Sequence, residues 1–275
     1  VPSVVDALMV TSSFLPGRGG IESYLSELCT LIAPRVAVMA PPQRDGTPLP
    51  RDLPYPTVPG PTSMLRPGRK VADAVVREAR ALGTDRIVFG TPWPLILIGP
   101  RLRAAGLRYS VIVHGAELVV PGAVPGLHRS VARALGMAEL LLPVSDYTGH
   151  ATAALLHRVG VDVPPMQNLR ARVDLDRFRP GLDATALRAS LGIAPDQRVV
   201  LCFGRLVPRK GVDWLVAAMS DVAVAVPGAV LVVGGTGPEL KKLQRLAARL
   251  EAPVVFAGRV ADDDAPVLYS TADVF

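Results

Sequence analysis

The sequence predicts an α/β protein with parallel sheets in two domains, and three observations support this fold class. Short apolar runs of strand length alternate with segments whose apolar residues recur at helical spacing. Glycine-containing turns join several of these runs to the next helix, as in repeated strand-turn-helix units with right-handed crossovers. The chain has 275 residues, 49% of them hydrophobic, which is enough for two domains of ordinary size.

The first part of the chain is expected to contain five strands separated by helices or loops. The strands are expected at residues 4–10, 36–40, 86–90, 109–113 and 139–144, and the helices at 21–32, 64–82, 94–105 and 146–157. Seven prolines between residues 41 and 59 exclude a helix there, so residues 41–61 are expected to form a surface loop. Ser145 is expected to cap the helix that follows it, which accounts for Ser145 and Asp146 without a ligand.

A domain boundary is expected where the periodicity breaks, because residues 163–180 contain prolines, mixed charges and no regular spacing. The resulting domains are residues 1–170 and 171–275. In the second domain, strands are expected at 199–203, 229–233 and 254–258, and helices at 183–191, from 211, 238–249 and 265–270. Residues 272–275 read as the start of a further strand, so the second domain is expected to be incomplete in this chain.

The turn after the expected strand 199–203 combines a glycine with several cations. Arg205, Arg209 and Lys210 lie between that strand and the next helix, at the edge of a parallel sheet where ligands bind. Arg205 could bind a diphosphate as a planar fork and Lys210 as a point charge, helped by the positive end of the helix. A solvated basic loop explains the same residues equally well.

Two further turns and one histidine are candidate binding groups. Gly19 and Gly20 precede the first helix, and Gly235 and Gly237 lie in the turn after strand 229–233, where their backbone could approach a phosphate, ribose or base closely. His114 follows strand 109–113 and could contact a substrate. Tight connections and a structural histidine are the alternatives.

Composition restricts the partners and the chemistry. The net charge is +6 and the pI is near 9.7, which favours anionic partners. Cys29 and Cys202 fall in different domains, so neither a disulfide framework nor a metal cluster is expected, and a reducing cytosol is the default compartment. The N-terminus reads as a strand and not as a signal peptide, and the apolar stretch 87–100 is too short to cross a bilayer. No RNA-binding motif is present, so no nucleic-acid partner is expected.

The expected helix within residues 64–82 is basic on one side and apolar on the other. Its cations outnumber its acidic residues, so it could contact anionic lipid headgroups. An ordinary solvated surface helix is the alternative.

Several segments in order resemble one enzyme family. The segments are SFLPGRGGIESYL, HGAE, PVSDYT, VDLDRF, GRLVPRKG, VVGGTGPE and FAGRV. They are similar to the retaining glycosyltransferases of family 4, whose GT-B fold has two Rossmann-like domains. Within that family the chain most resembles the bacterial GDP-mannose-dependent mannosyltransferases that act on phosphatidylinositol mannosides.

The resemblance implies roles for the candidate residues. The first domain would bind the acceptor and the second the nucleotide sugar, in a cleft between them. Arg205 and Lys210 would hold the donor diphosphate, Gly19 and Gly20 would approach the phosphates or sugar, His114 would line the transferred sugar, and Gly235 and Gly237 would lie on the nucleotide side. The leaving phosphate would accept the acceptor's proton, so neither a metal ion nor another cofactor would be required. The enzyme would be cytoplasmic and peripherally attached to the inner face of the plasma membrane.

The sequence departs from the family pattern at two places. The family has two glutamates seven residues apart that bind the donor, and this chain has no such pair. Arg172 stands where the family usually has glycine. These departures leave three alternatives open: a family 4 hexosyltransferase with a UDP-sugar donor, one with a soluble acceptor, or a nucleotide-binding module without activity.

Overall fold

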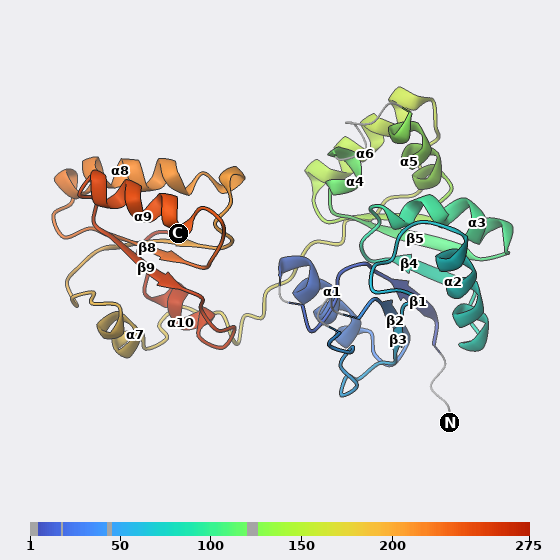
Figure 1. The fold of residues 1–275 in the computed structure, drawn as a ribbon, viewed down its shortest axis with the longest axis horizontal. Helices are drawn as coiled ribbons and strands as arrows, with labels where there is room; N and C mark the ends of the chain where they lie inside the picture. Colours follow the sequence, from blue (N-terminus) through green and yellow to red (C-terminus); the bar gives the residue numbers. More distant parts are fainter. Residues whose placement is uncertain (1–4, 18, 43–45, 120–125) are drawn as a thin grey trace. The chain divides into compact units, whose positions relative to one another are not determined.

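The computed structural model describes residues 5–17, 19–42, 46–119 and 126–275 (Figure 1). The chain divides into two compact units, residues 1–172 and residues 173–275. The predicted boundary after residue 170 lies two residues before this division. The two units are described separately below.

The first unit is built on a six-stranded sheet in the order β3-β2-β1-β4-β5-β6. Every neighbouring pair is parallel, as the sequence predicts. The strands are β1 (Ala7–Val10), β2 (Val36–Ala40), β3 (Thr57–Pro59), β4 (Arg86–Phe89), β5 (Arg108–Val113) and β6 (Leu140–Pro143). The strand order reverses between β1 and β4, and the carboxyl edge beside such a reversal is where open α/β sheets bind ligands.

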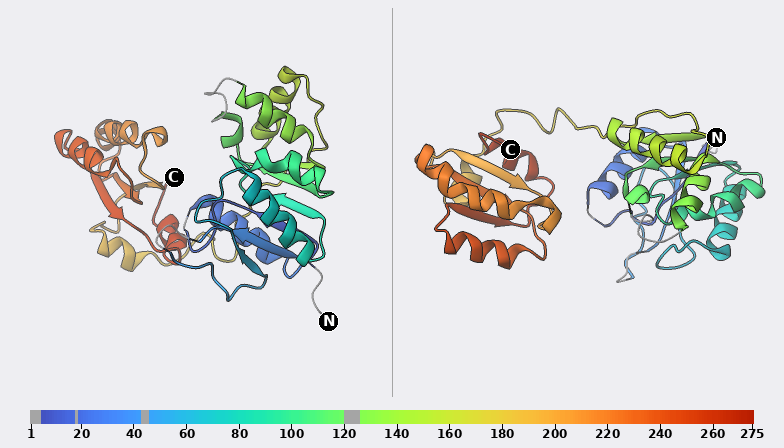
Figure 2. Two further views of the ribbon diagram at one scale, coloured as in Figure 1. Left: turned by 45° about the vertical axis from the view of Figure 1, so that its right-hand side comes forward. Right: turned by 90° about the horizontal axis from the view of Figure 1, so that it is seen from above.

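Helices cover both faces of this sheet because side chains alternate along each strand. In β1, Leu8 and Val10 pack into one core cluster while Met9 packs into the other. The first cluster includes residues of α2 and α3, the second includes residues of α1, and Figure 2 shows these helices on opposite faces. The helices of this unit are α1 (Gly20–Leu31), α2 (Arg69–Ala81), the 3₁₀ helix η1 (Leu95–Ile98), α3 (Gly99–Ala104), α4 (Ala116–Val119), α5 (Leu127–Gly136) and α6 (Asp146–Val159).

Residues 41–61 differ from the predicted surface loop. Thr57 to Pro59 form β3 beside β2, with Val38 opposite Thr57, and Leu49 and Tyr55 are buried. An edge strand tolerates proline because one of its sides needs no ladder hydrogen bond, so the prolines exclude a helix but not a strand. The predicted helix 94–105 is present as the 3₁₀ helix η1 followed by α3, whereas the sequence interpretation missed α4 and α5. Residue 4 of the first predicted strand, 4–10, lies outside the described residues.

The second unit contains a parallel sheet in the order β7-β8-β9. Its strands are β7 (Val199–Phe203), β8 (Val230–Gly234) and β9 (Val254–Gly258). Its helices are α7 (Thr185–Ser190), the 3₁₀ helix η3 (Pro208–Lys210), α8 (Val212–Ala225), α9 (Leu240–Arg249) and α10 (Ala265–Ser270). Val274, close to the C-terminal residue, forms a parallel bridge to Val200. Strand β7 is therefore paired on both sides, with β8 on one and with this C-terminal segment on the other.

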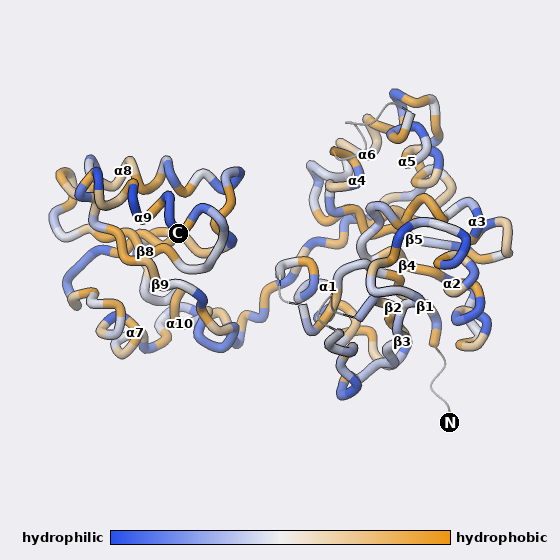
Figure 3. The backbone as a smooth tube through the Cα atoms, in the orientation of Figure 1, coloured by the Kyte–Doolittle hydropathy of each residue, from blue (hydrophilic) through white to orange (hydrophobic). Residues whose placement is uncertain are grey.

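The distribution of apolar residues follows these layers. Figure 3 shows hydrophobic residues along β8 and hydrophilic ones along much of α9. Helices α8 and α9 pack on one face of the small sheet, and α7 and α10 on the other. None of the helices in the described parts of the chain combines the length and the apolar character needed to cross a bilayer.

Candidate functional site

The first half of the candidate site is the carboxyl edge of the large sheet. The loops after β1 and β4 meet at Thr91, whose hydroxyl accepts a hydrogen bond from the Ser12 N–H at 2.7 Å. The same oxygen lies 2.9 Å from Thr11 Oγ1 and 2.9 Å from Ser12 Oγ. Thr11 and Thr91 are both buried, so these hydroxyls fix the path of the two loops beside the strand-order reversal.

His114 directly follows β5 on this edge. Its Nε2 lies 2.8 Å from the Gly90 carbonyl oxygen, which can only accept, so Nε2 bears the hydrogen. Burial lowers the pKa of His114 and outweighs the opposing effect of the Gly90 bond. The neutral ring therefore keeps a lone pair on Nδ1, which can accept a hydrogen bond from a ligand hydroxyl. Tyr24 packs edge-on against this ring, 5.8 Å between centroids.

Glu117 supports the turn that holds His114. Its side chain is 1% exposed, and its Oε1 accepts a hydrogen bond from the Gly115 N–H at 2.9 Å. Gly115 has φ +108°, a conformation that favours glycine. Burial raises the pKa of Glu117, while the N–H groups of Gly115, Glu117 and His114 oppose this rise. The sequence interpretation gave Glu117 no role, although an acidic residue in the first turn of a helix is a known capping signal.

Gly19 and Gly20 begin α1 at the same edge. A Cβ atom at Gly19 would lie 2.5 Å from Glu22 Oε2, whereas one at Gly20 would have no neighbour within 4 Å. Glu22 also accepts a hydrogen bond from the Ser13 hydroxyl. The Glu22 carboxylate ends a flexible side chain that can move aside, and the backbone of Gly19 is extended, so local packing does not require glycine at position 19. The space beside Gly20 is open to a ligand.

The second half of the candidate site is the loop that leaves the carboxyl end of β7. Leu206 is buried and anchors this loop, because its N–H donates to the Thr236 carbonyl at 3.0 Å and its carbonyl accepts from the Glu239 N–H at 3.2 Å. Arg205 and Lys210, on either side of this anchor, are exposed. Neither side chain forms an ion pair or hydrogen bond with a described residue, so both are available to an anion.

Lys210 lies in the 3₁₀ turn η3, which the sequence interpretation did not predict. Burial raises the pKa of Cys202, and the positive charge of Lys210 opposes this rise. The ammonium group of Lys210 therefore lies close enough to the Cys202 thiol, in the carboxyl half of β7, to influence its ionisation. Gly211 ends the turn with φ +64° and begins α8 without a side-chain cap, which leaves the first N–H groups of α8 without a side-chain acceptor.

Gly235 and Gly237 pack against the β7 loop. A Cβ atom at Gly235 would lie 2.0 Å from the Gly204 carbonyl oxygen, and one at Gly237 would lie 2.2 Å from the Leu206 carbonyl oxygen. These close backbone contacts explain why positions 235 and 237 are glycine. That the two glycines lie on the nucleotide side of the site stays a prediction. The structure thus gathers Gly20 and His114 on one sheet edge and Arg205, Lys210, Gly235 and Gly237 on the other.

Ser145 caps α6 as predicted, since its Oγ accepts a hydrogen bond from the Thr148 N–H at 3.1 Å. Asp146 pairs with Arg170 at 2.6 Å, so it too has a structural partner. Among the residues that the structure describes, no three His, Cys, Asp or Glu side chains are grouped as metal ligands.

Comparison with known proteins gives a family match and two long sequence matches. The family model for Glycosyl transferases group 1 matches residues 183–275. A GDP-mannose-dependent alpha-(1-6)-phosphatidylinositol monomannoside mannosyltransferase of Mycobacterium tuberculosis is 36% identical over 282 residues, covering 98% of this chain and 71% of that protein. A GDP-mannose-dependent monoacylated alpha-(1-6)-phosphatidylinositol monomannoside mannosyltransferase of Corynebacterium glutamicum is 31% identical, with the same coverage of both chains.

Solved structures agree on the fold. Anabaena Alr3699/HepE in complex with UDP-glucose superposes with a TM-score of 0.76 at 21% identity, covering 98% of this chain and 72% of that one. WaaG, a glycosyltransferase involved in lipopolysaccharide biosynthesis, gives 0.66 at 18% identity, covering 97% and 73%. The predicted GT-B fold class is confirmed.

Proposed function

The chain belongs to the group 1 glycosyltransferases, and from this premise we propose that it transfers mannose from GDP-mannose to a phosphatidylinositol mannoside. The support is the similarity over 98% of the chain to two relatives that are each named for this donor and this type of acceptor. GDP-mannose contains an α-linked mannose, and both relatives are named for an α linkage. The proposed reaction therefore retains the configuration at the anomeric carbon.

The proposed mechanism relies on charge stabilisation by the second unit. Sugar transfer passes through an oxocarbenium-like state in which the departing diphosphate gains negative charge. Arg205, Lys210 and the N-terminus of α8 interact more strongly with this state than with the bound donor, so their binding energy lowers the barrier. A phosphate oxygen accepts the proton of the attacking hydroxyl, so the mechanism needs no carboxylate nucleophile.

The first unit contributes groups suited to a neutral sugar. In this proposal Nδ1 of His114 accepts a hydrogen bond from a hydroxyl of the transferred mannose, and the backbone at Gly20 approaches the donor. Glu117 acts through the Gly115 N–H and so holds His114 in place. Gly235 and Gly237 keep the β7 loop, and with it Arg205, in a fixed position.

Donor binding tests the proposal directly. A ligand that binds only the folded state stabilises it by RT ln(1 + L/Kd), where L is the free ligand concentration, so at equal concentration the tighter ligand raises the melting temperature more. GDP-mannose should stabilise the protein more than UDP-glucose and UDP-mannose at equal concentration, and Lys210→Ala should reduce the shift. Equal shifts for the guanosine and uridine donors would contradict the proposed donor.

Transfer itself gives the second test. Radiolabelled mannose should move from GDP-mannose to a phosphatidylinositol mannoside in detergent, and not to free inositol. Because the proposed mechanism uses side-chain cations, addition of a chelator should leave the rate unchanged. A rate that falls on chelation and returns with a divalent ion would contradict the metal-independent part of the proposal.

The proposal also places the enzyme in the cytoplasm, in peripheral contact with the inner face of the plasma membrane through residues 64–82. The apolar face of α2 is buried in the core, including Val71 and Val75, so this contact would be made by charge and not by insertion. Arg69 and Lys70 at the start of α2 are exposed. The double variant Arg69→Glu, Lys70→Glu should sediment less with phosphatidylinositol vesicles, and unchanged sedimentation would refute the membrane contact.

A further inference from the structure

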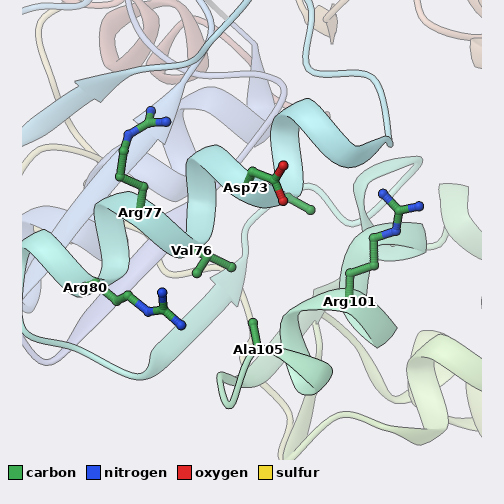
Figure 4. Close-up of a pocket in the computed structure, with 7 residues that line it drawn as sticks. Asp73, Val76, Arg77, Arg80, Arg101 and Ala105 are labelled. Carbon is green, nitrogen blue, oxygen red and sulfur yellow. The ribbon is translucent and has the colours of Figure 1, made fainter.

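A pocket of about 410 Å³ lies between α2 and α3 of the first unit. Figure 4 shows it in close-up, with side chains from both helices around it. It is lined by Ala72, Asp73, Val76, Arg77, Arg80, Arg101 and Ala105. None of these residues belongs to the candidate donor site, and their chemistry is unexplained by the proposed transfer reaction.

The base of the pocket is apolar and its walls are charged. Ala72, Val76 and Ala105 are small or short, so the two helices leave a hollow between them that longer side chains would fill. In Figure 4, Arg80 extends from α2 toward α3, and Arg101 stands on α3 on the opposite side. The pocket is therefore lined by an arginine from each of the two helices.

The charges around the pocket are mostly unpaired. Arg77 is engaged by Glu78, whose Oε1 accepts from its Nε at 3.1 Å. Arg80 and Arg101 form no ion pair or hydrogen bond with the described residues, and neither does the carboxylate of Asp73. Two free guanidinium groups bind phosphate oxygens well, because each presents several N–H donors in one plane.

Asp73 narrows the choice of ligand. A carboxylate repels a bare anion but accepts hydrogen bonds from hydroxyl groups. Two guanidinium groups and one carboxylate around a hollow of this size therefore match a phosphate ester attached to a ring or chain with free hydroxyls. We propose that the pocket between α2 and α3 binds a phosphorylated polyol, with Arg80 and Arg101 on the phosphate and Asp73 on a neighbouring hydroxyl.

The same chemistry occurs in a free inositol phosphate and in the headgroup of an inositol lipid. Binding of the lipid headgroup rests on the proposed function, since only an enzyme that contacts a membrane with inositol lipids would bring the headgroup to this pocket. The pocket itself requires only the residues of α2 and α3. A binding measurement without any donor therefore tests the pocket independently of mannose transfer.

The decisive variants lie on α3. Arg101→Gln removes a pocket guanidinium, whereas Arg103→Gln makes the same charge change two residues later, at an exposed position that does not line the pocket. Binding of myo-inositol 1-phosphate is measured by isothermal titration calorimetry without nucleotide. Arg101→Gln should weaken it about fivefold, as expected for one partly solvated charge-assisted contact, and Arg103→Gln should leave it unchanged. Equal weakening by the two variants would show that the ligand is attracted by the overall positive charge of the surface and not by the pocket, and would overturn the proposal.

Arg80→Gln provides a second pocket variant on α2, and thermal unfolding verifies that each variant is folded. Asp73→Asn tests whether the ligand carries hydroxyl groups. This variant should bind inorganic phosphate more tightly than the wild type does, and its preference for inositol phosphate over inorganic phosphate should be smaller. If the wild type binds both ligands equally well, the polyol assignment is wrong. Lys210→Ala should leave inositol phosphate binding unchanged, which separates failure of the pocket from failure of the donor site.

The membrane source is tested with vesicles of equal charge. Phosphatidylcholine vesicles containing phosphatidylinositol should bind the wild type more tightly than those containing the same fraction of phosphatidylglycerol. Arg101→Gln should remove this preference and Arg103→Gln should retain it. A preference that survives Arg101→Gln and Arg80→Gln would show that the headgroup is bound elsewhere and would overturn the lipid part of the proposal.

Discussion

The carboxyl edges of the two sheets differ in how their polar side chains are held. At the edge of the large sheet, Thr91 and His114 are hydrogen-bonded to neighbouring loops, and Glu117 is almost completely buried. At the edge of the small sheet, Arg205 and Lys210 are exposed and have no partner among the described residues. One edge is arranged before any ligand binds, and the other presents free charge.

The two edges are therefore suited to different ligand groups. Neutral hydroxyls are distinguished by acceptors in fixed positions, so the groups that bind them must be held by their neighbours. A diphosphate is recognised chiefly by charge, and long cationic side chains can adjust to it. The rigid parts of the second edge are accordingly the backbone contacts of Gly235 and Gly237, and not the cations themselves.

The largest effect should come from the glycine contacts that keep the second edge rigid. Gly237→Ala places a Cβ 2.2 Å from the Leu206 carbonyl oxygen, so the two loops must separate. We expect the free energy of unfolding to fall by about 3 kcal/mol, measured by urea denaturation. Gly20→Ala is the matched control, because its Cβ would meet nothing within 4 Å; it should retain stability but slow transfer. If Gly237→Ala were as stable as the wild type, the contact between Gly237 and Leu206 would not be what keeps the second edge rigid.

The next largest effect should come from the two free cations. Arg205→Ala and Lys210→Ala should each weaken donor binding by about 1.5–3 kcal/mol, the usual contribution of a hydrogen bond to a charged group. Arg209→Ala removes an exposed cation from the same turn and should change donor affinity much less. Calorimetric titration with GDP gives the measurement. If all three variants lose the same affinity, the loop attracts anions only by its net charge.

The hydroxyl cluster of the first edge should show a smaller effect. Thr91→Val leaves the half-buried Ser12 N–H and the buried Thr11 hydroxyl without their shared partner, which should cost about 1–2 kcal/mol of stability. Thr91→Ser keeps the hydroxyl and should restore most of this loss and the activity. Chemical denaturation and transfer assays on the two variants test the assignment, and equal behaviour of Val and Ser at this position would contradict it.

The smallest effect concerns pH. Because burial lowers the pKa of His114 in the folded protein, the unfolded chain takes up its proton first as pH falls below about 6.5. The wild type should therefore lose stability between pH 7 and pH 5.5, by less than about 1.4 kcal/mol per pH unit from this group. His114→Gln should flatten this part of the curve. Glu117→Gln should not, because the raised pKa of Glu117 acts in the opposite direction: protonation of Glu117 favours the folded state.

Much of the site was predictable because strand ends are visible in the sequence. His114 and Arg205 each follow a buried apolar run, and parallel strands bring their carboxyl ends to one edge of a sheet. Thr91 could have been found by the same reasoning, since it lies two residues after β4. The place of Glu117 in the first turn of a helix indicated a cap, but its burial could not be predicted, because α4 packs against α6, a later element of the chain.

The alternation of strands and helices, the parallel sheets, the cap at Ser145 and the cations after β7 follow from local periodicity and from residues adjacent in the chain, so they could be predicted without a structure. Tertiary structure decided the rest: β3 forms by pairing with β2, Gly237 is required by a backbone from another loop, and Arg80 and Arg101 share a pocket only because α2 and α3 pack together. Such features depend on contacts between segments far apart in the chain, and no local pattern encodes which segments will meet.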